Sequence, residues 1–227
     1  MRKIKFILPI SILITSLFAV INQFEESFSR LNNINSEFNS VTMPTVDSAV
    51  LLREDDLNSG VGVPMRYSQK IEVDFNIHAS GTWEELADGG MLWRLGIHSP
   101  GALGIKLFFD TFWLPDGSEF FIYSKNYDMS IGPYSNEQNH FDGTFGTPLV
   151  KSDYIVLEYY QPKNVYELPQ LNIDKVYHAY RDIHSFFNDR ENRDCGDNVV
   201  CSSADAWEDQ INSVIYLEMY QYICSAA

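Results

Sequence analysis

Hydrophobic and polar side chains alternate in short segments through the middle of the chain, from about residue 65 to residue 182. In residues 71–77, apolar Ile, Val and Phe occupy every second position, and Glu, Asp and Asn occupy the positions between them. A period of two is typical of a β-strand with one buried face. Alternation of this kind, or a dense aliphatic and aromatic run, marks residues 71–77, 91–98, 103–114, 120–123, 154–160 and 176–180.

Glycine and proline separate these segments and supply the backbone angles of tight turns. Examples are Ser99-Pro100-Gly101, Pro115-Asp116-Gly117 and Gly132-Pro133. No helical periodicity occurs between the segments, which disfavours parallel βαβ folds. Short strands at this spacing favour two packed antiparallel sheets. The sequence therefore predicts a mainly β fold, an antiparallel β-sandwich over residues 65–182.

The N-terminus has the pattern of a signal peptide over residues 1–21. Arg2, Lys3 and Lys5 give it a positive start, and residues 6–21 are mostly apolar. That run is short for a bilayer span, which needs about 20 apolar residues. Ala19 is the best small residue for cleavage, and an uncleaved membrane anchor is the alternative. We expect an exported chain, periplasmic, on the cell surface or secreted, with no stable membrane span after signal cleavage.

The other segments lack the alternating pattern. Residues 22–64 are rich in Asn, Ser and Glu, and we expect a flexible lead-in with a few helical turns near residues 24–31. Residues 183–194 are expected to be a polar linker. Residues 195–227 form a different segment, which carries all three cysteines of the chain.

Composition and charge narrow the function classes. Aromatic residues make up 14% of the chain, which favours strands because flat side chains suit a pleated surface. The formal net charge is -15, and such a surface repels phosphate backbones. We therefore expect no nucleic-acid partner.

Motifs for catalysis, metals and cofactors are missing from the sequence. No G-x-S-x-G and no glycine-rich phosphate loop with a lysine is present. Adjacent carboxylates at Asp55-Asp56 and Glu84-Glu85 do not face each other, and we expect them to be solvated. The histidines form no H-x-H or H-x-x-x-H pair, and surface or turn positions account for all five, namely His78, His98, His140, His178 and His184. The sequence predicts no catalytic residue, no metal site and no cofactor.

Four tyrosines are candidates to line a sugar-binding groove: Tyr123, Tyr134, Tyr159 and Tyr160. Large aromatic side chains in strands also form the core and the contacts within hairpins. We favour packing over sugar binding for these four positions.

The cysteines are Cys195, Cys201 and Cys224. In an exported protein cysteines normally form disulfides, and an odd number leaves one without a partner in the chain. Cys195 and Cys201 are close enough in sequence to bridge each other. Their spacing differs from the usual spacing of zinc ligands.

Two parts of the chain resemble secreted bacterial trypsin-like serine proteases of the lysyl endopeptidase type. Residues 93–101, 107–117 and 121–123 resemble the propeptide domain that precedes the protease. Residues 195–211, followed by Cys224-Ser225, resemble the first residues of the mature protease. The resemblance covers roughly residues 65 to 227.

This resemblance implies a protease precursor of which only the first 33 protease residues, 195–227, are present. A trypsin-like domain needs two β-barrels and a triad from distant parts of the chain, and so short a piece cannot bury an adequate core. The triad would fall after Ala227, so the chain is expected to be a fragment, a truncated product or a degenerate precursor. In the family, the three cysteines pair with later cysteines.

The resemblance predicts a non-catalytic pro-region whose partner is the cognate protease domain, in cis. Family activity is peptide-bond hydrolysis after basic residues. Arg190 and Arg193 mark the expected processing region, or else are solvated charges of the linker. We also expect the apolar run 214–223 to present an unpaired, aggregation-prone strand edge. The alternative function is a free-standing exported β-sandwich that binds a carbohydrate or a protein.

Overall fold

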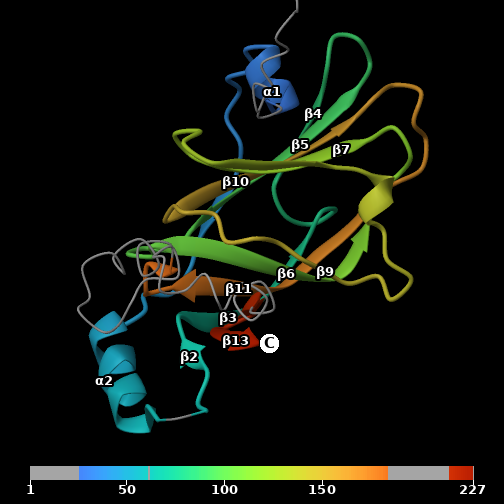
Figure 1. Ribbon diagram of the computed structural model, residues 1–227. Coiled ribbons are helices and arrows are strands. Elements are labelled where there is room, and N and C mark those ends of the chain that lie inside the picture. Colours follow the sequence, from blue (N-terminus) through green and yellow to red (C-terminus); the bar gives the residue numbers. More distant parts are fainter. Residues whose placement is uncertain (1–25, 61, 184–214, 227) are drawn as a thin grey trace, which may run out of the picture.

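The structure is a computed structural model that describes residues 26–60, 62–183 and 215–226. The expected signal peptide, Arg190, Arg193, Cys195 and Cys201 lie outside these residues. The described chain forms three β-sheets and little helix (Figure 1). The helical elements are α1 (Phe28–Leu31), α2 (Ser48–Asn58) and the short 3-10 helix η1 (Asn136–Gln138).

The largest sheet has six strands, ordered β1-β5-β10-β7-β8, with β4 also pairing with β5. All of its pairs are antiparallel except β1 with β5. The strands are β1 (Ser40–Thr42), β4 (Thr82–Glu85), β5 (Met91–His98), β7 (Glu119–Ser124), β8 (Ser130–Tyr134) and β10 (Tyr154–Gln161).

A second sheet has four antiparallel strands in the order β3-β11-β6-β9. The third sheet has three strands in the order β12-β13-β2. The strands of the second sheet are β3 (Ser68–Asn76), β6 (Gly104–Trp113), β9 (Phe145–Gly146) and β11 (Gln170–Ala179). Those of the third are β2 (Met65–Arg66), β12 (Ile215–Met219) and β13 (Tyr222–Ala226). The expected mainly β, mainly antiparallel class is confirmed, and the described strands close no barrel.

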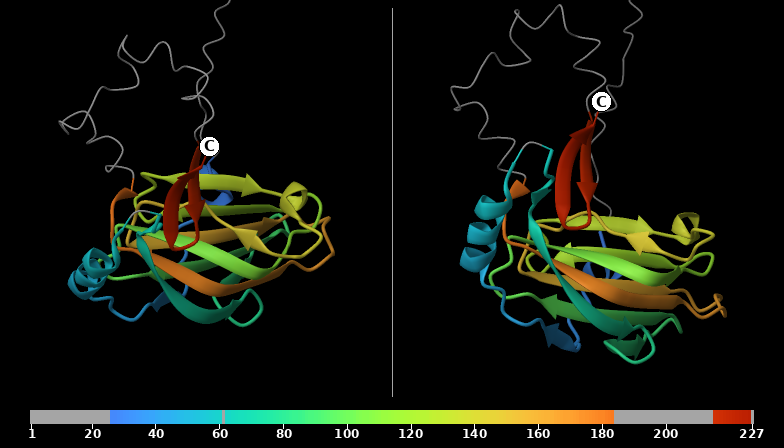
Figure 2. Two further views of the ribbon diagram at one scale, coloured as in Figure 1. Left: turned by 60° about the horizontal axis from the view of Figure 1, so that its bottom comes forward. Right: turned by 90° about the horizontal axis from the view of Figure 1, so that it is seen from below.

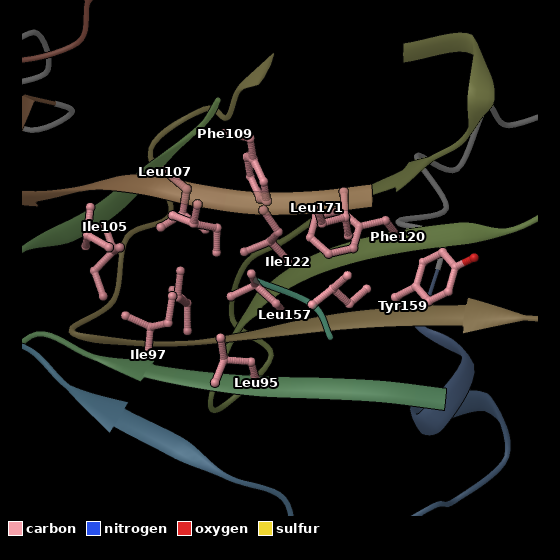
Figure 3. Packing of buried hydrophobic residues seen from close by; sticks show 14 of the residues in the cluster. Leu95, Ile97, Ile105, Leu107, Phe109, Phe120, Ile122, Leu157, Tyr159 and Leu171 are labelled. Carbon is pink, nitrogen blue, oxygen red and sulfur yellow. The ribbon is translucent and has the colours of Figure 1, made fainter. Parts of the chain in front are cut away.

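The main core lies between the six-stranded and four-stranded sheets (Figure 3). Successive side chains of a strand point to opposite faces of the sheet, so the inward positions of both sheets produce the period-two pattern of the sequence. Burying each such side chain contributes about 1.5–3 kcal/mol. From the six-stranded sheet come Leu95, Ile97, Phe120, Ile122, Leu157 and Tyr159, and from the four-stranded sheet Ile105, Leu107, Phe109 and Leu171.

Strand β5 differs from the expectation of one buried face, because both of its faces are buried. Residues 26–39 lie against the outer face of the six-stranded sheet, and we call them the N-terminal cover. Arg94 in β5 is only 4% exposed, and its guanidinium lies 4.8 Å from the centre of the Phe38 ring. The sequence pattern of β5 alone does not reveal this second layer.

The segment 22–64, expected to be a flexible lead-in, differs from that expectation in its described part. β1 joins the six-stranded sheet beside β5, with Ser40 opposite Gly96. A side-chain carbon at position 96 would collide with Ser40 and Tyr154, so glycine allows β1 to approach. Asp47 caps the N-terminus of α2, and its side chain accepts hydrogen bonds from Ala49 N and Val50 N, both at 3.1 Å. Tertiary contacts order this region despite its polar composition.

In the ranges that the structure describes, no helix is both long enough and apolar enough to cross a bilayer.

Candidate functional site: the face that holds residues 215–226

Strands β12 and β13 form a hairpin, which we call the C-terminal hairpin. Its strands are joined at Tyr220 and Gln221, between the paired residues Met219 and Tyr222. Tyr220 has a φ of 40°, the left-handed backbone that tight hairpin turns require. Figure 2 shows the hairpin projecting from the body with its turn against the four-stranded sheet.

The expectation of an unpaired strand edge over residues 214–223 is corrected for β13, which pairs on both sides, whereas β12 is an edge strand of the three-stranded sheet. β13 pairs with β2, with Ile223 opposite Met65 and Tyr222 opposite Arg66. The amide N–H of Tyr67 also donates to the carbonyl of Gln221 at 2.9 Å. The sequence did not indicate the pairing of β13 with β2, because β2 is only two residues long and its local sequence does not identify it as a partner strand.

An apolar cluster seals the base of the hairpin. Ile223 is 5% exposed and packs in a cluster with Tyr67, Leu149, Ala179 and Ile183. This cluster is separate from the main core between the sheets. The hairpin therefore shields from water apolar residues that come from three distant parts of the chain.

An ion pair joins the hairpin to the outer face of the four-stranded sheet. Glu218 Oε1 accepts hydrogen bonds from Lys106 Nζ at 2.8 Å and from Tyr67 Oη at 2.9 Å. The Lys106 side chain is 9% exposed and that of Glu218 is 24% exposed. Because Lys106 is largely removed from water, an ionised partner is needed to offset the cost of burying its charge. Glu218 thus gives the hairpin a specific position on the sheet.

The turn residue Tyr220 lies against two aromatic rings of the sheet. Its ring centre is 5.3 Å from that of Phe108, edge to face, and 5.9 Å from that of Tyr177, stacked. Contacts of this type contribute about 0.5–1.5 kcal/mol beyond area burial. Burial, with smaller effects of Tyr220 and Asp174, raises the pKa of Tyr177 to about 12. Tyr177 therefore stays neutral at physiological pH.

A network around Asp55 holds β2 where it can pair with the hairpin. Arg66 Nε donates to Asp55 Oδ1 at 2.8 Å, and Tyr180 Oη and Arg181 donate to Oδ2 at 2.7 and 3.0 Å. Burial by itself raises the pKa of Asp55, but the hydrogen bonds from Tyr180, Arg181 and Arg66 outweigh it and lower that pKa below its usual value. Asp55 was expected to be solvated, and its side chain is instead only 14% exposed.

Beside the hairpin turn is an open hollow of about 500 Å³. Lys175 Nζ lies 4.9 Å from the centre of the Phe108 ring, on the wall of this hollow. Lys70, also on the wall, donates to Glu72 Oε1 at 2.8 Å. Lys175 is also paired with Asp174, so this face combines aromatic surface with lysines whose charges are compensated, and Tyr220 of the hairpin packs on its aromatic part.

Of the cysteines expected to form disulfides, the structure places one. Cys224 lies in β13 opposite Leu217, is partly buried, and is unpaired among the described residues. The docking residues Lys106, Phe108, Tyr177 and Glu218 were not identified from the sequence. The available signal was aromatic Phe108 on the outward phase of its strand, where a polar residue is expected.

His178 corrects the expectation that all histidines occupy surface or turn positions. Its ring is fully buried, and Ser99 Oγ lies 2.8 Å from His178 Nδ1. Burial lowers the pKa of His178. Since Ser99 is also fully buried, this serine and histidine cannot reach a substrate, and their contact fastens the turn after β5 to β11.

The four tyrosines considered for sugar binding are packed in the fold. Tyr123 and Tyr159 are 2% and 0% exposed, and Tyr134 packs against the main core. Tyr160 stacks on Phe28 of the N-terminal cover with ring centres 3.7 Å apart. The preference for packing is confirmed at these positions, and they form no groove.

No protein-family model matches the chain, and no solved structure gives a significant match to it.

Proposed function

We propose that this chain is the non-catalytic pro-region of an exported, trypsin-like serine protease precursor, built on a β-sandwich that binds the downstream segment in cis. The observation that carries the proposal is the docked C-terminal hairpin. Residues 215–226 lie three residues after the segment 195–211, which resembles the start of a mature protease. A pro-domain has to hold its protease segment by contacts such as those of Glu218 and Tyr220.

The contacts also suit a temporary association. Glu218 keeps a quarter of its side-chain surface exposed, and the hairpin projects from the body (Figure 2). Interactions that are partly solvated form and break more readily than those of a sealed core. Under this proposal the hairpin is held while the downstream domain folds and is released after processing between residues 183 and 194.

The binding step is tested by cutting the chain between the two parts. A site for a sequence-specific protease is inserted after residue 194, and the cut protein is analysed by size-exclusion chromatography at about 50 µM. We expect the C-terminal piece to co-elute with the domain, and the double variant Glu218→Ala, Tyr220→Ala to release it. Leu57→Ala, at an 86% exposed position of α2, is the control that should retain it. Release of the unmutated piece would contradict the proposal.

The pro-region role itself is tested by assisted refolding. A denatured protease domain of the lysyl endopeptidase type is diluted with and without the full chain, and recovered hydrolysis of a lysyl chromogenic ester is measured. We expect a higher yield with the chain, and a smaller gain with Lys106→Ala, Tyr177→Ala, which removes two docking residues. Equal yields with and without the chain would refute the role.

The chain alone should show no ester hydrolysis that a serine-directed inhibitor suppresses. Turnover of that kind would show that it is an enzyme and not a pro-region.

A further inference from the structure

A second surface, independent of the hairpin, lies at the opposite end of the four-stranded sheet. Strand β11 begins at Gln170 opposite Trp113, the last residue of β6, and ends near Tyr180, which contacts α2. Three connections meet beside Trp113: residues 114–118, 135–144 and 162–169. We call this region the loop end.

The loop end exposes large aromatic side chains that have no part in the core. Phe141 is fully exposed, Tyr166 is 86% exposed and Trp113 is 42% exposed. Aromatic groups this exposed lose the free energy that burial would provide. Several of them around one hollow mark a binding surface, whereas a single exposed aromatic residue needs no explanation.

Two adjoining hollows occupy the surface between these aromatic residues. One, of about 400 Å³, is bordered by Trp113, Phe141, Asn136 and His140, and the other, of about 360 Å³, is bordered by Tyr166. The carboxylates Asp116 and Glu167 border both hollows. Both hollows thus have aromatic surface and share hydrogen-bonding groups, and we call the two together the groove.

Hydrogen bonds hold the groove in shape without a ligand. Trp113 Nε1 donates to Glu167 Oε1 at 2.9 Å, which sets the plane of the indole. Asn139 is bonded twice to Leu114, accepting from its N–H and donating to its carbonyl, both at 2.8 Å. Because the Trp113 ring is already positioned, little of its conformational entropy is lost when a ligand binds.

We propose that the loop end binds a neutral saccharide chain. The flat faces of Trp113 and Phe141 in one hollow, and of Tyr166 in the other, suit the apolar C–H faces of pyranose rings. Asp116 and Glu167 accept hydrogen bonds from sugar hydroxyls, and Asn136 both donates and accepts. The paired carboxylates and the net charge of -15 exclude acidic polysaccharides.

The experiment uses the full chain and four- to six-unit oligosaccharides of neutral glucans, xylans and mannans. Tryptophan fluorescence and calorimetry measure binding at pH 7. We expect a Kd of about 10 µM to 1 mM for at least one series, corresponding to a weak but specific site. Trp113→Ala and Phe141→Ala should each weaken binding about tenfold or more. Trp113→Phe, which keeps an aromatic face, should weaken it less.

Tyr222→Ala, at an exposed tyrosine of the hairpin, is the matched control and should leave binding unchanged. Circular dichroism melts confirm that each variant is folded. Absence of binding to all neutral series, or equal binding by Trp113→Ala, overturns the proposal. Binding of a lysine-rich peptide with no saccharide binding overturns it as well, because the carboxylates then serve a basic peptide. None of these outcomes alters the refolding result that tests the pro-region role.

Discussion

Each of the two large sheets has an outer face that is covered by one end of the described chain, and the two covers are held in different ways. The N-terminal cover is anchored by Glu158, which is 1% exposed and accepts from Ser29 N at 2.9 Å and Tyr123 Oη at 2.8 Å. The C-terminal hairpin is anchored by Glu218, which is 24% exposed. Both anchors are glutamates, but only one of them is sealed from water.

The remaining contacts follow the same division. Arg94 under the N-terminal cover donates to Glu84 at 3.0 Å and also contacts Ser36, and its own side chain is 5% exposed. At the hairpin, Tyr220 and Tyr222 keep 51% and 41% of their surface exposed. Buried polar groups that are fully bonded are costly to disrupt, whereas half-solvated contacts exchange with water. The N-terminal cover is therefore a permanent layer of the fold, and the hairpin is a docked element.

The largest expected effect is at Glu158. Glu158→Ala removes the shared acceptor of Ser29 and Tyr123 inside a sealed layer, and we expect a loss of about 3–5 kcal/mol in the free energy of unfolding. Urea unfolding followed by circular dichroism measures it. Glu72→Ala, whose side chain is 74% exposed, is the control and should change stability by less than about 0.5 kcal/mol. A loss at Glu158 no larger than the control would remove the contrast between the covers.

A smaller and local effect is expected at Ile223. Ile223→Ala removes buried methyl groups from the base of the hairpin and should weaken docking by about 2–3 kcal/mol. Hydrogen exchange should accelerate at the Tyr67 amide, which donates to Gln221, and stay slow at Leu157 in the main core. Tyr222→Ala on the exposed side of the same strand is the control. Equal acceleration at both amides would show that the hairpin and the sheets unfold as one unit.

Low pH should reduce the stability of the hairpin side of the molecule, because Asp55 then becomes protonated. The folded state lowers the pKa of Asp55 below 3.8, so folding favours the ionised form. The resulting stabilisation is complete above that unfolded value and is lost as pH falls from about 3.8 through the folded pKa. Asp55→Asn should cost about 1–2 kcal/mol at pH 7, and the difference from the unmutated protein should shrink below pH 3.8.

The neighbouring exposed residue serves as the control for this titration. Asp56 is exposed, so Asp56→Asn should leave the free energy of unfolding nearly unchanged both at pH 7 and at pH 3. A difference for Asp55→Asn that is independent of pH between 7 and 3 would mean that the charge of Asp55 does not hold β2.

The smallest expected effect is at the Lys106–Glu218 pair. Glu218→Gln keeps the shape of the side chain but removes its charge, and we expect a loss of about 1 kcal/mol in hairpin docking. The loss is measured by exchange at the Tyr67 amide in 0.05 and 1 M NaCl, and it should be smaller in high salt because the pair is partly solvated. A loss of the same size at both salt concentrations would mean that Glu218, like Glu158, is shielded from the solvent.

The sequence predicted six of the ten strands of the two large sheets, because alternation is a local property of each segment. It did not predict β1, β4, β8 and β9, which have two to five residues each and are too short to show a clear alternation. It did not predict the second buried face of β5 or the pairing of β2, because these depend on partners far along the chain. Arg94 has the sequence pattern of a solvent-facing residue and is buried only because Phe38 and Ser36 lie over it. At the candidate site, the outward Phe108 was visible in the sequence, but its contact with Tyr220 was not.

The pairing of β2 with β13 also orders the events of synthesis. Tyr67 and Glu218 are 151 positions apart, whereas the strands of both large sheets are complete at Ala179. At a translation rate of about 5–20 residues per second, the stretch from Tyr180 to Ala226 takes about 2–9 s to emerge. During that interval Ile223 is not yet present to cover the apolar surface of Tyr67 and Leu149, so this part of the fold is completed last.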